Sequence, residues 1–135
     1  MVIRLLAAAV AFAIAASAAC AQDIEIGLNT VEPQPDACRL TFVARNDSGT
    51  DLARVVTEAV LFTKAGKVAQ FTLFDFGALP GGRQRVRQFD VDGLACTDLG
   101  QVLFNGVSAC EGARPETCAA ALRPSSMIDE IEVTG

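Results

Sequence analysis

Residues 38–49 read CRLTFVARNDSG, and this stretch decides the fold class. The even-numbered residues from Cys38 to Ala44 are apolar, and polar residues stand between most of them, so one side of a strand faces a core. The NDSG cluster that follows is typical of a turn. We therefore expect a half-buried β-strand that ends in a tight turn, rather than a helix.

The same two-residue period continues through most of the chain from Asp23 onward. Residues 54–63 are apolar and β-branched on both faces, as expected of a central strand. Turns are indicated at 64–67, where a hairpin fits, and at 79–82, where Pro precedes Gly. Further strands are expected at 68–76, 84–91 and 100–110, an edge segment at 127–133, and the one place for a helix at 116–122.

These elements predict one all-β domain over residues 22–135. About seven short strands, separated by turns at regular spacing, favour an immunoglobulin-like antiparallel β-sandwich over a barrel or an α+β fold. At 135 residues the chain has room for this domain and a short leader, but not for a second domain.

The leader reads MVIRLLAAAVAFAIAASAACA and ends in the Ala-Cys-Ala cleavage pattern of residues 19–21. One basic residue, Arg4, precedes an apolar run, so we predict a signal peptide over residues 1–21 and a periplasmic or secreted protein. A cut after Ala18 also fits. An uncleaved membrane anchor is the first alternative, although the uncharged run is shorter than the ~20 residues of a span. A lipidated Cys20 is less favoured, because Ser17 stands where a bulky aliphatic residue is usual.

The composition excludes several functions. The chain has no His, Tyr or Trp, and it therefore lacks the usual general base, the commonest metal ligand and the best interface anchors. Without Arg4, ten basic residues stand against sixteen acidic ones, a net charge of −6. We therefore expect no enzyme activity, no cofactor or metal, and no binding to nucleic acid.

The four cysteines of the mature chain predict two structural disulfides in an oxidising compartment. A strand over 101–110 spans about 30 Å, which separates Cys96 from Cys110 too far for a bridge. In a sandwich the second and penultimate strands run the same way, which brings Cys38 and Cys96 to one end. We expect the pairs Cys38–Cys96 and Cys110–Cys118. Redox or zinc chemistry would need closer cysteine pairs.

Arginine recurs at every second residue before and within the 84–91 strand. Arg83, Arg85 and Arg87 therefore share one face. If that face is the outer one, the apolar residues from Phe89 onward reach the core only through a β-bulge near residues 87–88.

This strand is expected to pair with the strand that carries outward-facing Arg39 and Arg45. The five arginines would then form one candidate binding face for carboxylates or phosphates. The alternative is a solvated surface whose arginines pair with acids such as Glu25 or Glu58. The candidate binding face consists of Arg39, Arg45, Arg83, Arg85 and Arg87.

Other polar clusters carry weaker signals. Asp90 with Asp92, and the acids at 129–132, could form a hydrolytic carboxylate pair only within a cleft. Residues 46–51 offer oxygen ligands for calcium but lack the EF-hand spacing, so we interpret them as a turn. No catalytic residue is assigned.

Over residues 38–110 the expected order of elements is strand, Asn-rich turn, strand, Gly66 turn, strand, Pro80-Gly81 turn and strand. This series resembles the FxLYD-like sandwich domains of bacterial envelope proteins. It is also similar to small exported bacterial proteins with the same paired cysteines. The resemblance implies a fold and a compartment, and it implies no functional residue.

The leading hypothesis is a non-catalytic exported binding or assembly module that acts through a sheet face or edge on another envelope protein. One alternative is an accessory subunit of a membrane complex, held by an uncleaved leader; only then would the protein contact a membrane. The last alternative is a carboxylate-based enzyme. The sequence leaves the oligomeric state open.

Overall fold

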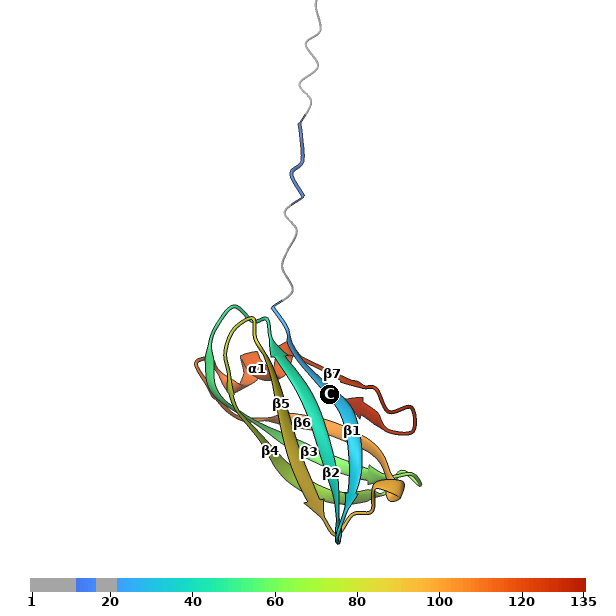
Figure 1. The fold of residues 1–135 in the computed structure, drawn as a ribbon. Coiled ribbons are helices and arrows are strands. Elements are labelled where there is room, and N and C mark those ends of the chain that lie inside the picture. Colours follow the sequence, from blue (N-terminus) through green and yellow to red (C-terminus); the bar gives the residue numbers. More distant parts are fainter. Residues whose placement is uncertain (1–11, 17–21) are drawn as a thin grey trace, which may run out of the picture.

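A computed structural model describes residues 12–16 and 22–135 of the chain (Figure 1). Most of the predicted signal peptide, residues 1–11 and 17–21, lies outside the described residues. Residues 12–16 are exposed and have no regular secondary structure. Within the described ranges, no helix is long and apolar enough to cross a membrane.

Eight strands and two short helical segments make up the described domain. In chain order the elements are β1 (Ile24–Gln34), β2 (Ala37–Asn46), β3 (Leu52–Thr63), β4 (Val68–Leu79), β5 (Gln84–Asp92), the 3-10 turn η1 (Cys96–Asp98), β6 (Leu99–Glu111), α1 (Pro115–Ala121), β7 (Leu122–Ser126) and β8 (Glu132–Thr134).

The strands form two four-stranded sheets, in the orders β5-β2-β1-β7 and β4-β3-β6-β8. Figure 1 shows the two sheets as layers, with α1 at the end of the domain where residue 22 enters. The predicted β-sandwich is confirmed, with eight strands instead of about seven. The long strands pair antiparallel, as expected, whereas β7 and β8 join β1 and β6 in parallel. The predicted edge segment 127–133 contributes only its end, to β8.

An aromatic cluster fills the space between the sheets. The alternation predicted for β2 is confirmed, because Cys38, Leu40, Phe42 and Ala44 are all fully buried. The ring of Phe42 lies 5.6 to 6.1 Å, centroid to centroid, from four other rings. These separations suit edge-to-face and tilted packing between aromatic rings. The four neighbouring rings belong to Phe74, Phe76, Phe89 and Phe104.

Asn46 ends β2 and is fully buried, although it is polar. Its Nδ2 donates to the carbonyls of Thr50, at 2.8 Å, and Leu79, at 2.7 Å. Its Oδ1 accepts from the backbone N of Ser48, at 3.0 Å, and from the Ser48 hydroxyl, at 2.6 Å. Because every polar atom of the side chain is hydrogen-bonded, burying it costs little. Asn46 thus joins the β2–β3 turn to the end of β4.

Both predicted disulfides are present. Cys38 in β2 is bonded to Cys96 in η1, across the two sheets, with 5.0 Å between the Cα atoms. Cys110 near the end of β6 is bonded to Cys118 in α1, with a Cα separation of 6.5 Å. The first bridge closes a sequence separation of 58 residues and the second one of 8. The helix that the sequence allowed at 116–122 is α1, which the second bridge fixes to its sheet.

We predict that replacing Cys38 and Cys96 together by Ala lowers the free energy of unfolding by about 4 kcal/mol, because a long loop is released in the unfolded chain. The matched control is the double replacement of Cys110 and Cys118, for which the same entropy argument gives about 2.5 kcal/mol. Urea denaturation of both variants measures the difference. A control variant that is the less stable of the two would contradict the prediction.

Candidate functional site

The arginines of β2 lie on the outer face of the sheet β5-β2-β1-β7, as expected, and each has an acidic partner. Arg39 donates to both carboxylate oxygens of Asp90, at 2.8 and 3.1 Å. Arg45 donates to the carboxylate of Asp47 at 3.0 Å. These pairs neutralise the two guanidinium groups in place, although the acids differ from the Glu25 and Glu58 considered from the sequence.

The expectation that five arginines share one surface is wrong. The pairing of β5 with β2 runs without a register shift, so no bulge occurs near residues 87–88. Alternation therefore places Arg85 and Arg87 on the same side of β5 as Phe89 and the buried Val91. Arg83 precedes β5 and is exposed. The outward residue of β5 opposite Val43 is Val86, and 57% of its surface is exposed.

Arg87 points toward the other sheet because its long side chain reaches polar groups there. Its Nε donates to the carbonyl of Phe76 at 2.6 Å, and its Nη2 donates to that of Ala78 at 3.0 Å. Between these residues Gly77 has φ +62°, at a register shift where β4 bulges away from β3. The guanidinium thus forms hydrogen bonds with backbone carbonyls of the edge strand β4 and links the two sheets. The two-residue period alone could not reveal such a partner.

We predict that Arg87→Met lowers the free energy of unfolding by about 1–3 kcal/mol, because two carbonyls lose a charged donor. Arg83→Met, at an exposed position, is the matched control and should change stability by less than about 0.5 kcal/mol. Thermal and urea denaturation test both variants. Equal stability of the two variants would assign Arg87 to the solvated surface instead.

Two exposed ion pairs shift the pKa values of their groups. Hydrogen bonding to Arg54, at 2.9 Å, and to the backbone N of Gly77 lowers the pKa of Asp75. Hydrogen bonding to Arg39 likewise lowers the pKa of Asp90, and each acid raises the pKa of its arginine. A depressed carboxyl pKa stabilises the fold above the ordinary Asp pKa of about 3.9, and the contribution is lost as the pH falls through the folded-state pKa.

We predict that Asp75→Asn is less stable than the parent protein at pH 7 and that this difference disappears toward pH 2. The reason is that the parent protein then loses the same ion pair by protonation. Denaturation series at both pH values measure it. The control Asp129→Asn, in the exposed β7–β8 connection, should change stability at pH 7 by less than about 0.5 kcal/mol. A difference for Asp75→Asn that persists at pH 2 would contradict the assignment.

The turn at 46–51, considered as a calcium loop, uses its oxygens internally. Asn46 and Ser48 bond within the turn, and Asp51 accepts from the backbone N of Gly81 at 2.7 Å. Across the described residues, no three acids, Cys or His lie close enough together to hold a metal ion. The structure thus agrees with the interpretation of this segment as a turn.

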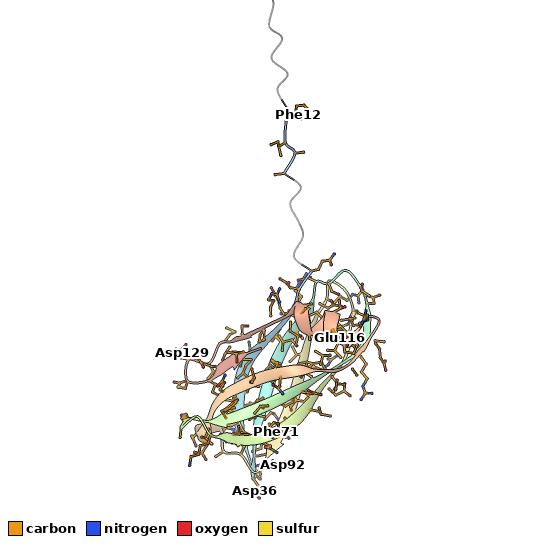
Figure 2. The ribbon with its side chains drawn as sticks, turned by 180° about the vertical axis from the view of Figure 1, so that it is seen from behind. Phe12, Asp36, Phe71, Asp92, Glu116 and Asp129 are labelled. Atoms are coloured by element: carbon orange, nitrogen blue, oxygen red, sulfur yellow. A yellow bond between two sulfur atoms is a disulfide. The ribbon has the colours of Figure 1, made fainter. Side chains whose placement is uncertain are left out.

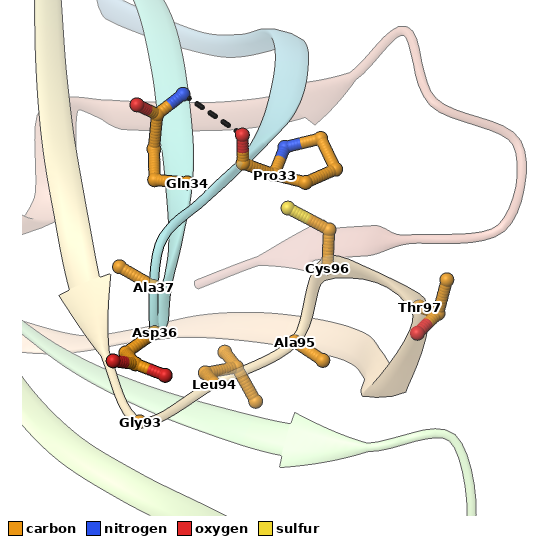
Figure 3. A pocket seen from close by; sticks show the side chains of 9 residues that line it. All are labelled: Pro33, Gln34, Asp36, Ala37, Gly93, Leu94, Ala95, Cys96 and Thr97. Carbon is orange, nitrogen blue, oxygen red and sulfur yellow. Dashed lines mark hydrogen bonds between the residues drawn. The ribbon is translucent and has the colours of Figure 1, made fainter.

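A shallow hollow of about 410 Å³ lies at the end of the domain that carries the Cys38–Cys96 bridge (Figure 3). Figure 3 shows the Cys96 sulfur directed toward Pro33, and Leu94 beside Gly93. Of the described residues that line it, Asp36 is the one acid, and none is basic. One carboxylate among apolar groups offers no acid–base pair, and the hollow is mostly apolar.

A mostly apolar patch lies on the outer face of the other sheet, β4-β3-β6-β8, beside the exposed Arg54–Asp75 ion pair. On the edge strand β4, Phe71 is 72% exposed and Leu73 60%, and Figure 2 shows Phe71 at the surface of this sheet. In register, Phe71 lies opposite Val60 of β3, and Val60 lies opposite Leu103 of β6. We call this surface the Phe71 face and define it by Glu58, Val60, Phe71, Leu73, Leu103 and Asn105.

The sequence predicts a strand at 68–76 but does not single out this surface. Two apolar residues, Phe71 and Leu73, face outward, while Phe74 and Phe76 face the core. An edge strand usually carries charge on its outer face. Apolar residues on both faces of this segment indicate a strand with an apolar outer face. The sequence does not show that this strand lies at the edge of its sheet.

The described residues define a disulfide-linked β-sandwich with two paired arginines on one outer sheet face and an apolar patch on the other. In comparisons with protein-family models, with curated proteins and with solved structures, nothing matches this chain significantly. The resemblance to FxLYD-like domains stays a prediction. The two disulfides indicate that the protein matures in an oxidising compartment.

Proposed function

We propose that this chain is an exported, immunoglobulin-like, non-catalytic binding module of the cell envelope, and that it docks a segment of another envelope protein on its Phe71 face. The predicted leader and the two disulfides support export to the periplasm or beyond. A partner in the same compartment then meets this surface after both proteins have folded.

The exposed pair Phe71 and Leu73 carries the proposal. Large apolar side chains that adjoin one another on a surface lose contact with water when a partner covers them, and such patches mark interaction sites. The arginine surface supports docking less well, because Arg39 and Arg45 already have carboxylate partners. Exposed ion pairs of this kind contribute little and would have to be broken for a new partner.

A photo-reactive amino acid placed at position 71 or 73 of the exported protein tests the proposal in intact cells. We expect one discrete adduct from each position, and mass spectrometry identifies the protein. The matched control is position 86, because Val86 is a similarly exposed apolar residue on the edge strand of the other sheet. The double variant Phe71→Ser/Leu73→Thr should then weaken binding of the purified partner by roughly tenfold or more.

Three outcomes would contradict the proposal. The first is no adduct from positions 71 and 73, and the second is an equal yield from position 86. The third is an adduct of two copies of this chain, which would make the Phe71 face a dimer interface. The free energy of unfolding of the double variant, measured by thermal denaturation, should remain within about 0.5 kcal/mol of that of the parent protein, since both side chains are exposed.

A further inference from the structure

One acidic side chain lies within the Phe71 face. Glu58 of β3 stands opposite Leu73 on one side and Gly106 on the other. A Cβ atom at Gly106 would lie 3.1 Å from the Glu58 carboxylate, so the absence of a side chain there leaves room for it to lie across β6. The carboxylate therefore lies over β6, next to the apolar side chains of the Phe71 face.

Glu58 has no cation beside it among the described residues. It shares this with ten of the sixteen acids, and it differs from them in its place beside the exposed Leu73 of the Phe71 face. Within residues 12–16 and 22–135, the five ion pairs take up five other acids and none involves Glu58. The other acid on this stretch of the outer face, Asp75, is paired with Arg54 at 2.9 Å. The Phe71 face is thus apolar with one uncompensated negative charge.

A hollow of about 300 Å³ adjoins this carboxylate. Phe71, Thr72 and Leu73 of β4 line one part of it, and Glu58, Ala59, Val60 and Asn105 line the rest. The aliphatic stem of a lysine or arginine packs well on apolar surface while its charged end stays at a polar group. A cation above the face of an exposed phenylalanine ring gains further attraction. The hollow therefore offers apolar surface for the stem of a long basic side chain and a carboxylate for its charged end.

We propose that the partner presents a lysine or arginine with apolar neighbours to this hollow, so that its cation pairs with Glu58 and its apolar neighbours cover Phe71 and Leu73. The inference rests on the proposed function and names the chemistry of the partner. The proposed partner group is positively charged, whereas the arginines of the candidate binding face predicted a negatively charged one. Charge complementarity at such a surface sets which partner is accepted more than how tightly it is held.

A different role for Glu58 has to be separated from this one. A charge in the middle of an exposed apolar sheet face also prevents association between copies of a protein. The substitution Glu58→Gln keeps the size of the side chain and removes the charge. Recognition predicts a loss of preference for basic ligands by a monomeric protein, whereas protection against association predicts self-association with unchanged ligand preference.

The experiment titrates the isotope-labelled, disulfide-bonded exported protein with blocked tripeptides and follows amide chemical shifts. The probes are leucine–lysine–leucine and its counterparts with glutamine or glutamate in the centre. We expect the lysine peptide to bind roughly threefold more tightly than the glutamine peptide, with shifts at residues 58–60 and 71–73. Glu58→Gln should abolish this preference. The control Glu132→Gln, an exposed acid of β8 in the same sheet, should preserve it.

Equal binding of the three peptides, or a lysine preference that survives Glu58→Gln, would overturn the inference. Self-association of Glu58→Gln in sedimentation, with its lysine preference intact, would do the same. The proposed function fails separately, when positions 71 and 73 give no adduct. If those positions capture a partner whose affinity does not change with Glu58→Gln, the docking surface stands and the basic partner is wrong.

Discussion

The covalent bridge between Cys38 and Cys96 fixes how the two sheets face each other, and the rest of the structure depends on it. Cys38 stands at the start of β2 in one sheet, and Cys96 begins η1, the short turn that leads into β6 of the other. At the opposite end of β2, the buried Asn46 binds the carbonyl that ends β4. Strand β2 is therefore tied to the facing sheet at both ends, by a covalent bond and by a fully satisfied polar side chain. The aromatic cluster around Phe42 occupies the space between these two ties.

This arrangement explains which features could be predicted from the sequence. The alternation in β2 followed from a local period, and the disulfide pairing followed from strand length and direction, because bridges tolerate only short Cα separations. The direction of Arg87 did not follow. The alternation in this strand allows Arg87 to point either outward or toward the other sheet. The inward direction depends on the carbonyls of Phe76 and Ala78, which belong to another strand. A partner distant in sequence therefore decided what the local pattern left ambiguous.

The two outer faces of the sandwich differ for a related reason. On the face of β2 and β5, Arg39 forms an ion pair with its cross-strand neighbour Asp90, and Arg45 pairs with Asp47 just beyond the end of β2. On the face of β3 and β4, the same cross-strand positions carry Val60 opposite Phe71, and Glu58 opposite Leu73. On the first face, both arginines of β2 are paired with acids of the same fold. On the second face, apolar side chains and the Glu58 carboxylate stay exposed to solvent. The hairpin turn at 64–67 predicts that β4 pairs with β3, but it does not predict that β4 lies at the edge of the sheet, and the exposure of the Phe71 face depends on that edge position.

Strand β4 could in principle bind a partner through its backbone edge instead of its outer face. Two features oppose pairing along that edge. At its C-terminal part the Arg87 guanidinium already binds the carbonyls of Phe76 and Ala78, and before its N-terminal part the exposed lysines 64 and 67 lie in the turn. Lysine near an edge and bulges within it both hinder the addition of another strand. The backbone of β4 is therefore protected while the side chains of Phe71 and Leu73 stay exposed, and this combination favours docking on the face over addition of a strand.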